Sequence, residues 1–454
     1  MERQQRHASA CVARSPARRV SPSSASFIAA IALATTLLVT ACVTRQIPSP
    51  GTTTSIRPPA DAVPEVRVAL ATAVQNAPVT ATGPWRLYDG GNGVIVRGRA
   101  TDAWTVRRRG NTLRAVPRRG AATPWVESPL TLRPDSGAQF VIFAGRRYRG
   151  ALRLVASDSG LTVVNLLGVE DYLRGVVPLE IGVNRGPSDQ AAVEAQAIAA
   201  RSYTWVRLNS GQGRSSRTGA YDLTATVADQ VYGGADAERE ATDRAVRTTA
   251  GLVLKFGGRV VDAPYSSSCG GESAAPDEVW RVGGTSAYLR RVSDRVTGST
   301  DRYYCDIAPR FTWTREFTAV ELDAVARTYL RQYTEGLSGP PGQVRRISVE
   351  SRTPSGRVAR TVFLTDRGSY AVRGNDVRSV LRTAGGEILN STYFSIETES
   401  ARNGALLRVV LRGKGYGHGV GMCQWGAIGR ARAGQTARTI LAAYYPGTTV
   451  GPAS

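Results

Sequence analysis

One carboxylate stands out because apolar residues surround it in the sequence. Glu180 ends the run GVVPLE at residues 175–180, and Ile181 follows it. If the fold encloses this side chain, its charged form is disfavoured, its pKa rises and it holds a proton at neutral pH. General acid catalysis at a glycosidic oxygen requires a carboxylic acid of this kind. The alternative is a surface residue at the end of a strand, without a chemical role.

The second candidate lies in a glycine-dense segment near the C-terminus, GYGHGVGMCQWGA at residues 415–427. Its glycines permit positive φ angles and a close approach of the backbone. The segment contains His418, one of the two histidines of the chain. His418 either orients or stabilises a sugar beside Glu180 or makes hydrogen bonds that hold the glycine loop. The sequence leaves both interpretations open.

A cysteine nucleophile is the other chemical class to weigh. Cys269 or Cys423, with His418 as the base, would make the pair that cysteine peptidases use. Cys423 lies only five residues from His418, and the other histidine, His7, falls in an N-terminal leader. The sequence also contains no G-x-S-x-G elbow. We therefore favour the carboxylate over a nucleophilic thiol.

The first 41 residues have the pattern of an export signal. Five arginines and one glutamate precede an apolar stretch at residues 27–38, which is too short for a good spanning helix. Small residues then lead to Cys42, as in a bacterial lipobox, so we expect Cys42 to anchor the mature chain through more than one acyl chain. Val43 is not the aspartate of inner-membrane retention, which favours the outer membrane. A plain signal peptide with a fortuitous cysteine is the alternative.

The charge of the chain is strongly positive, with a formal net charge of +22. Lysine occurs only at Lys255 and Lys414, so arginine supplies nearly all of the positive charge. Nucleic acid would be the usual partner for such a charge. Export argues against nucleic acid and favours an anionic polymer on the periplasmic side, either cell-wall glycan or lipid headgroups.

Three cysteines remain after the leader and Cys42: Cys269, Cys305 and Cys423. Export permits disulfides. A bond between Cys269 and Cys305, which are 36 positions apart, would stabilise the fold by about 3 to 4 kcal/mol. Three is an odd number, and we expect Cys423 to stay free and buried.

The elements that must position these residues point to an α+β fold. Residues 65–155 contain short alternating runs punctuated by glycine pairs, which predicts β structure with hairpins. Residues 169–177 lead to Glu180, and a helix begins after it, with Ser188 as the candidate N-cap. That helix, to about Leu208, is rich in alanine and therefore central and buried. We expect β-rich sheets or a barrel packed against it.

The sequence also predicts an ion pair on the alanine-rich helix and a division of the chain into domains. Glu194 and Arg201 are two turns apart on the alanine-rich helix, and we favour a structural ion pair between them. The domain organisation is a leader at 1–41, a Thr/Pro-rich tether at 42–64, a β-rich region at 65–155 and a further domain at 156–450.

Several ordered motifs carry a resemblance to a known family. They are VEDYLRGVVPLE at 169–180, EAQAIAARSY at 194–203, DQVYGG at 229–234, YSSSCGG at 265–271 and GHGVGMCQWG at 417–426. With these motifs the chain resembles the SpoIID/LytB family of bacterial cell-wall proteins. The resemblance spans about residues 161–446, which is most of the mature chain.

The resemblance implies a peptidoglycan lytic transglycosylase, which cleaves glycan strands and leaves anhydromuramic ends. Glu180 occupies the position of the family's catalytic glutamate, and one carboxyl group suffices for this reaction. Asp171 and Asp229 remain candidates for a second carboxylate. The alternative is a non-catalytic glycan-binding lipoprotein that enhances a cell-wall amidase.

Five residues are candidates for substrate binding or support: His418, Arg201, Tyr203, Gln230 and Trp425. We interpret Tyr203, Gln230 and Trp425 as packing and hydrogen-bonding scaffold more than as glycan contacts. Some family members carry a His/Cys zinc cluster near the Ser-rich loop. The mature chain has a single histidine, and Cys269, Cys305, Cys423 and His418 lack CxxC-like spacing. We therefore expect no metal and no cofactor.

Overall fold

The computed structural model describes residues 64–209, 219–281, 286–334 and 336–453. The expected leader, the tether up to residue 63 and the lipidation of Cys42 lie outside the described residues. The chain divides into the units Met1–Thr53 and Thr54–Ser454, and all elements below belong to the second unit. Within the described ranges, no helix combines the length and the apolar character needed to cross a bilayer.

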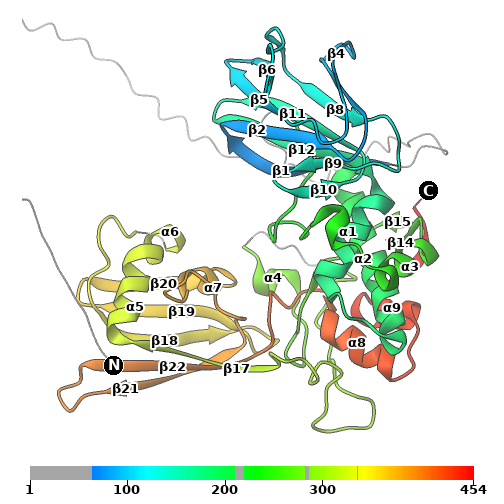
Figure 1. The fold of residues 1–454 in the computed structure, drawn as a ribbon. Helices are drawn as coiled ribbons and strands as arrows, with labels where there is room; N and C mark the ends of the chain where they lie inside the picture. Colours follow the sequence, from blue (N-terminus) through cyan, green and yellow to red (C-terminus); the bar gives the residue numbers. More distant parts are fainter. Residues whose placement is uncertain (1–63, 210–218, 282–285, 335, 454) are drawn as a thin grey trace, which may run out of the picture. The chain divides into compact units, whose positions relative to one another are not determined.

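Two open β-sheets form the N-terminal part of the described chain (Figure 1). Among the described residues the first has seven strands in the order β13-β1-β12-β11-β8-β3-β4, and the second has six in the order β10-β9-β2-β5-β6-β7. Valine and leucine side chains from both sheets fill one hydrophobic core. Of the two architectures expected, open sheets are therefore formed and not a barrel. The strand bounds are β1 Glu65–Val74, β2 Asn76–Ala81, β3 Trp85–Tyr88, β4 Val94–Gly98, β5 Trp104–Arg109, β6 Thr112–Pro117, β7 Val126–Glu127, β8 Leu130–Pro134, β9 Val141–Phe143, β10 Arg146–Tyr148, β11 Ala151–Ser157, β12 Gly160–Gly168 and β13 Leu223–Thr224.

The first sheet joins the start of the described chain to the segment that leads into the candidate site. β1 pairs antiparallel with β12, from Glu65 opposite Gly168 to Val74 opposite Leu161. The expected boundary between residues 155 and 156 falls inside β11, whose partners in the sheet are β8 and β12. The β-rich region and the segment before Glu180 thus share one sheet.

The alanine-rich helix is central, as the sequence predicts. α2 (Gln190–Asn209) contacts α1 (Val169–Ile181), α3 (Glu240–Thr248), α8 (Gln424–Arg432) and α9 (Ala437–Tyr444). A short 3-10 turn at Pro187–Asp189 precedes it. Small side chains let these helices approach closely, and the fully buried alanines are Ala192, Ala195, Ala197, Ala199 and Ala200.

The segment before Glu180 differs from the expectation. We expected residues 169–177 to lead to Glu180 before a helix began, but α1 starts at Val169 and contains Glu180 in its last turn. The buried side chains Val169, Tyr172, Leu173 and Val176 recur at helical spacing. The valine pair and Pro178, which both disfavour helix, hid that period.

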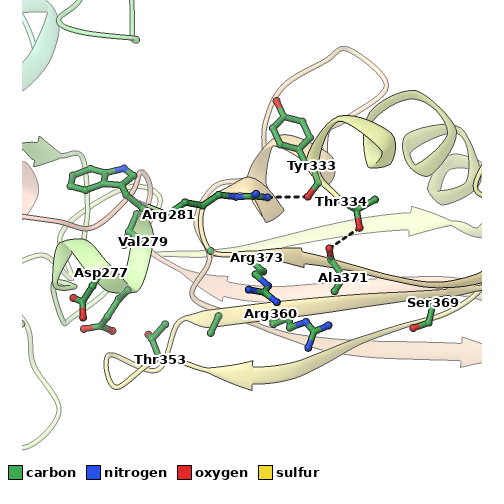
Figure 2. Close-up of a pocket in the computed structure, with 14 residues that line it drawn as sticks. Asp277, Val279, Arg281, Tyr333, Thr334, Thr353, Arg360, Ser369, Ala371 and Arg373 are labelled. Atoms are coloured by element: carbon green, nitrogen blue, oxygen red, sulfur yellow. Dashed lines mark hydrogen bonds between the residues drawn. The ribbon is translucent and has the colours of Figure 1, made fainter. Parts of the chain in front are cut away.

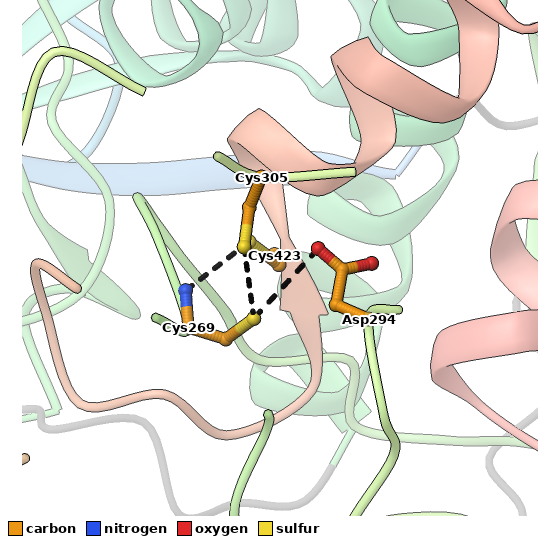
Figure 3. Close-up of side chains that lie close together, drawn as sticks. All are labelled: Cys269, Asp294, Cys305 and Cys423. Atoms are coloured by element: carbon orange, nitrogen blue, oxygen red, sulfur yellow. Dashed lines mark hydrogen bonds between the residues drawn. The ribbon is translucent and has the colours of Figure 1, made fainter. Parts of the chain in front are cut away.

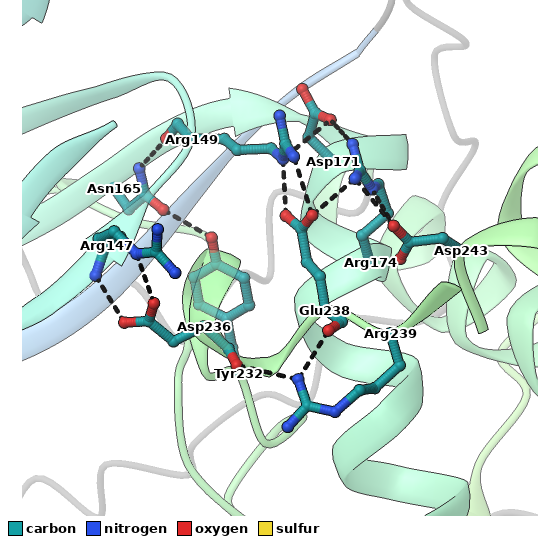
Figure 4. Close-up of polar contacts among 10 residues, drawn as sticks. All are labelled: Arg147, Arg149, Asn165, Asp171, Arg174, Tyr232, Asp236, Glu238, Arg239 and Asp243. Atoms are coloured by element: carbon teal, nitrogen blue, oxygen red, sulfur yellow. Dashed lines mark hydrogen bonds and ion pairs between the residues drawn. The ribbon is translucent and has the colours of Figure 1, made fainter. Parts of the chain in front are cut away.

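A polar network holds α1 to the loop between β10 and β11 and to α3 (Figure 4). Glu238 accepts from Arg149 at 2.6 Å and from Arg174 at 2.6 Å, and Arg174 also donates to Asp243 at 2.8 Å. Tyr232 donates to Asn165 at 2.8 Å within the core. The orientation of α1 is thereby fixed from several elements, and that orientation positions its C-terminal turn.

Residues 312–414 have a hydrophobic core of their own. Two three-stranded sheets, β17-β22-β21 and β18-β19-β20, enclose it with three helices. α5 continues through a π-turn at Ala326–Leu330 into α6. The bounds are β17 Thr312–Thr318, α5 Ala319–Val325, α6 Arg331–Tyr333, β18 Val344–Arg352, β19 Val358–Thr365, β20 Gly368–Arg373, α7 Asp376–Val380, β21 Phe394–Ser400 and β22 Leu406–Lys414.

Short strands and one short helix complete the fold. β14 (Leu252–Phe256) forms a hairpin with β15 (Arg259–Val260) and also pairs with β24 (Thr449–Pro452). β16 (Tyr265–Ser266) pairs parallel with β23 (Met422–Cys423), and α4 covers Pro276–Val279. The β16–β23 pair brings the Ser-rich loop beside the glycine-dense segment.

Candidate functional site

Glu180 lies in the last turn of α1, where the helix is brought to a stop. Gly182 follows with φ +103° and ψ 145°, a conformation that side-chain-bearing residues rarely adopt. Arg185 donates to the carbonyl of Ile181 at 2.7 Å and so satisfies an end carbonyl of the helix. Glu180 thus lies at the negative end of the helix dipole, which disfavours the charged form of its carboxyl group.

The Glu180 carboxyl group is held from two directions. Its Oε1 accepts the backbone N–H of Val231 at 2.8 Å. Burial raises the pKa of Glu180 above its ordinary value, although the hydrogen bonds from Val231 and the Gln424 side chain act in the opposite direction. The residue is half-buried, so the acid is enclosed on the protein side and still reaches the surface.

Gln230 is the residue that fixes the Val231 amide. Its side chain is fully buried and has a partner at each end. The Oε1 atom accepts from Tyr172 at 3.2 Å and from Thr204 at 2.9 Å, and Nε2 donates to the hydroxyl of Tyr265 at 2.9 Å. Gln230 therefore joins α1, α2 and β16 directly behind the carboxyl group.

The two other candidate carboxylates, Asp171 and Asp229, lie in separate polar contacts, and Tyr203 takes part in that of Asp229. The Tyr203 hydroxyl donates to Asp229 at 3.3 Å, and the guanidinium of Arg207 lies 3.5 Å above the Tyr203 ring. Asp229 also accepts from Thr224 at 2.8 Å. Asp171 lies 3.4 Å from Arg174.

Arg201 is paired, but not with the partner that the sequence suggested. Its guanidinium is buried and donates to both oxygens of Glu170, at 2.8 and 2.7 Å. It also donates to the carbonyl of Leu252 at 3.0 Å. Glu194, the expected partner, instead accepts from Gln190 at 3.3 Å. The expected Glu194–Arg201 pair is wrong, because the Arg201 side chain extends from α2 toward the start of α1.

His418 has a backbone partner at each ring nitrogen. Nδ1 accepts the N–H of Val420 at 3.0 Å, so Nε2 carries the proton and donates to the carbonyl of Tyr265 at 2.9 Å. Burial and the nearby Arg378 lower the pKa of His418 to about 4. The ring packs against Trp280 with centroids 5.3 Å apart. A neutral imidazole thus connects the glycine-dense segment to β16.

Trp425 connects the same two segments on the side of α8. Its backbone N–H donates to the carbonyl of Ser267 at 3.0 Å. The guanidinium of Arg185 lies 5.1 Å from the centre of its half-buried indole ring. Two apolar side chains near Glu180 in sequence, Leu179 and Val183, are exposed at 40% and 38%. Exposed apolar side chains thus flank Glu180 in the sequence on both sides.

The three described cysteines come together in the interior (Figure 3). The sulfur atoms of Cys269 and Cys305 are 3.6 Å apart, longer than the roughly 2.05 Å of a disulfide. Cys423 is free and buried, as we expected, and it accepts the N–H of Cys269 at 3.1 Å. Asp294 joins the group, with an oxygen 3.9 Å from the Cys269 sulfur.

Two cavities in the described part of the chain are lined by residues from the range 277–414. One of about 600 Å³ is lined by Trp280, Arg281, Tyr333, Arg360 and Arg373 (Figure 2). A second is lined by residues of β17, β21 and β22, among others. Glu180 lines neither cavity, and the candidate site therefore rests on the environment of its carboxyl group and not on an enclosed pocket.

Three contributors to this region carry no signal in a single sequence. Val231 acts through its backbone, and Gln424 and Asp294 are ordinary polar residues until the fold brings them to Glu180 and to the thiols. Gln424 lies within the glycine-dense segment, so the sequence marks its position but not its partner. Asp294 lies in a loop between α4 and β17 without a recognisable motif.

Two family models match the chain. The model described as Stage II sporulation protein matches residues 157–256, which contain α1, Glu180, α2 and Val231. A domain of unknown function, DUF8618, matches residues 292–421.

Curated relatives extend the similarity along the chain. The amidase enhancer of Bacillus subtilis (strain 168) is 31% identical over 306 residues, covering 61% of this chain and 40% of the relative. Stage II sporulation protein D of the same organism is 28% identical over 324 residues, covering 67% and 82%. An uncharacterized protein of Brachyspira hyodysenteriae is 28% identical over 308 residues, covering 67% and 73%.

Proposed function

The chain belongs to the SpoIID/LytB family, and we propose that within this family it acts as a peptidoglycan lytic transglycosylase. It cleaves the bond between N-acetylmuramic acid and N-acetylglucosamine in glycan strands and leaves anhydromuramic ends. Its task is the remodelling of the cell wall. Its substrate is an anionic polymer, which suits the arginine-rich composition of the chain.

The environment of Glu180 is the observation that carries this proposal. Burial and the C-terminal end of α1 both favour the protonated carboxyl group. The Val231 amide fixes one oxygen at 2.8 Å. The carboxyl group is thus oriented, holds its proton more readily than an exposed glutamate and still reaches the surface, as a general acid must.

One carboxyl group performs both halves of the reaction. Glu180 first gives its proton to the departing N-acetylglucosamine oxygen as the glycosidic bond breaks. The resulting carboxylate then takes the proton of the muramic C6 hydroxyl, whose oxygen bonds to C1 and closes the anhydro ring. The proton returns to Glu180 and no water is consumed, unlike the two-carboxylate hydrolases.

The other candidate residues position Glu180. Gln230 fixes the segment whose amide faces the carboxyl group, and Tyr203 and Arg201 hold α2 to the surrounding loops and to α1. His418 holds the glycine-dense segment to β16. The half-buried ring of Trp425 and the exposed Leu179 form the apolar surface on which a sugar ring packs.

The protein works at the wall from a membrane anchor. The export pattern and Cys42 support a location outside the cytoplasm, with the lipid of Cys42 in the outer membrane as the anchor of this proposal. Growth with a labelled fatty acid tests the anchor: label should enter the wild-type chain and be absent from Cys42→Ser.

Digestion of purified glycan tests the activity. The wild-type chain should release anhydro-terminated fragments from peptidoglycan, and preferably from peptide-stripped glycan, as detected by mass spectrometry. Glu180→Gln should lower the rate by about 100-fold or more, because it removes the acid and leaves an acceptor for the Val231 amide. Glu240→Gln, a strongly exposed carboxylate on α3, is the matched control and should retain activity.

A second function is favoured by one relative, the amidase enhancer. In that case the chain binds glycan and stimulates a cell-wall amidase without cleaving sugar bonds. Glu180→Gln would then preserve function in cells, and the wild-type protein would yield no anhydromuramic products. Release of stem peptides by an added amidase, with and without the chain, measures this second activity directly.

A further inference from the structure

Three thiols and one carboxylate from distant parts of the chain meet in the interior. Cys269 follows β16, Asp294 and Cys305 lie in the segment between α4 and β17, and Cys423 ends β23. The ligand atoms of all four lie within 4.8 Å of one another, and all four residues are buried (Figure 3). Thiols and a carboxylate are the groups that bind thiophilic divalent cations in proteins, and here four of them share one small volume.

The spacing of the group fits a tetrahedral metal site. Two thiolates bound to one zinc ion at about 2.3 Å lie about 3.8 Å apart when the geometry is tetrahedral. The sulfur atoms of Cys269 and Cys305 are 3.6 Å apart, and Oδ2 of Asp294 is 3.9 Å from the Cys269 sulfur. These two distances match the spacing that a shared ion requires, and all four ligand atoms lie within 4.8 Å of one another.

The carboxylate of Asp294 is oriented by its neighbours. Its Oδ1 accepts from the Tyr444 hydroxyl at 2.7 Å and from Arg430 at 3.2 Å. The other oxygen, Oδ2, is left facing the Cys269 sulfur. An outer partner that holds one ligand atom so that another faces the ion is the usual arrangement around protein metals.

Cys423 is held in the same manner. Its sulfur accepts the backbone N–H of Cys269 at 3.1 Å and that of Gly426 at 3.3 Å. It also occupies the N-cap of α8, where the helix dipole favours negative charge. Both features stabilise a thiolate, which is the form that binds metal.

From this geometry we propose that Cys269, Cys305, Cys423 and Asp294 bind one zinc-type divalent cation. Three thiolates select a thiophilic ion, and the tetrahedral spacing favours zinc among these. The four protein ligands fill the coordination sphere, and their burial excludes water, so the site is structural.

The ion would hold together the segments that carry the candidate site. Cys269 lies four residues beyond Tyr265, whose carbonyl accepts from His418. Cys423 directly precedes Gln424, whose side chain bonds to Glu180 and to Gln196. Loss of the ion would thus release Gln424 and weaken its hydrogen bond to the Glu180 carboxyl group. Metal binding itself does not depend on lytic activity.

Metal analysis of the full chain, purified without chelator, tests the proposal. We expect about one zinc per chain. Exchange for Co²⁺ should produce an intense sulfur-to-cobalt charge-transfer band and the visible bands of a tetrahedral ion. Cys11→Ser/Cys42→Ser, which removes the two cysteines outside the cluster, should keep both signals, and Cys305→Ser and Asp294→Asn should lose them.

A pair of neighbouring tyrosines separates metal binding from folding. Tyr444→Phe removes the hydrogen bond to Asp294 and should weaken zinc affinity by about 10- to 100-fold in a chelator competition. Tyr445→Phe is the matched control, because its hydroxyl bonds to no ligand side chain: it donates to the carbonyl of Pro264 and accepts the backbone N–H of Met422. Zinc affinity should stay unchanged.

Two results would overturn the proposal. One is a disulfide between any two of Cys269, Cys305 and Cys423 in the exported chain, found by non-reducing peptide mapping. The other is a wild-type chain that holds no stoichiometric metal and gives no cobalt bands after incubation with Co²⁺. Equal zinc affinities of Tyr444→Phe and Tyr445→Phe would remove Asp294 from the ligand set.

Discussion

The backbone N–H of Val231 lies 2.8 Å from Oε1 of Glu180. This bond joins the last turn of α1 to the segment that Gln230 anchors between α1, α2 and β16. It favours the charged carboxylate, whereas burial favours the protonated form, and burial dominates the pKa. The carboxyl group is therefore both fixed in position and raised in pKa.

Glu180→Gln should stabilise the fold at neutral and alkaline pH. The pKa of Glu180 is raised in the folded state, so the folded protein binds the proton more tightly than the unfolded chain does. This contribution to the free energy of unfolding is fully present below the ordinary pKa of glutamate. It is lost as the pH rises through the folded-state pKa. Glutamine carries no charge and still accepts the Val231 amide. Urea unfolding across pH should show a gain for the variant that grows with pH and vanishes in acid. A variant less stable than wild type at pH 8 would contradict the raised pKa.

Removal of Glu170 should destabilise the protein, because it leaves the buried guanidinium of Arg201 without its carboxylate. The Arg201 side chain is 2% exposed and that of Glu170 is 34% exposed. Loss of one partner of a buried pair costs about 3 to 5 kcal/mol, and the partial exposure of Glu170 favours the lower end. The midpoint of urea unfolding of Glu170→Ala measures this cost.

Glu194→Ala provides the comparison for Arg201. Glu194 lies on the same helix as Arg201 but bonds to Gln190 instead. Its removal should change the free energy of unfolding by less than about 0.5 kcal/mol. Equal losses for Glu170→Ala and Glu194→Ala would contradict the pairing found in the structure.

The sequence predicts much of the fold because periodicity and turn residues act locally. The strands found within residues 65–155 and the buried α2 agree with the patterns that predict them. The helix α1 is not evident in the sequence, because Val176, Val177 and Pro178 disfavour helix. In the fold, burial against α2 and the polar network of Arg174 override that preference. Tertiary contacts of this kind leave no local signal.

The candidate site was only partly predictable. Glu180 and His418 stand in conspicuous surroundings, so their positions could be singled out in the sequence. Their partners could not, because Val231, Gln424 and Tyr265 are brought to them by chain segments that lie far away in the sequence. For the same reason, the sequence does not show that Glu170, and not Glu194, is the partner of Arg201.

His418 should make the stability of the protein depend on pH in mild acid. Its pKa is lowered to about 4 by burial and by the cations Arg378 and Arg357, so the unfolded state binds the proton first. Stability from this group is present above its ordinary pKa and is lost as pH falls toward 4, by at most about 1.4 kcal/mol per pH unit. Unfolding of wild type and His418→Gln between pH 7 and 4 should show this slope in wild type alone. Parallel curves would contradict a buried neutral imidazole.

Gly175 should not tolerate alanine, although it lies inside a helix. A Cβ atom at this position would stand 2.5 Å from the ring of Tyr232 and 3.0 Å from the carbonyl of Gly234. Tyr232 cannot move aside easily, because it is buried and its hydroxyl donates to Asn165. Overpacking costs about 1 to 3 kcal/mol, which exceeds the roughly 1 kcal/mol that alanine gains over glycine in a helix. Gly175→Ala should therefore lower the unfolding midpoint and, by displacing α1, reduce lytic activity.

Gly186→Ala is the control for this substitution. Gly186 has φ −85° and ψ 177°, which alanine adopts without strain, and no atom lies within 4 Å of the added Cβ. Alanine there should leave stability unchanged or raise it by up to about 1 kcal/mol, because it restricts the unfolded chain. If Gly175→Ala proved as stable and as active as Gly186→Ala, the close packing of α1 on Tyr232 could not be what positions Glu180.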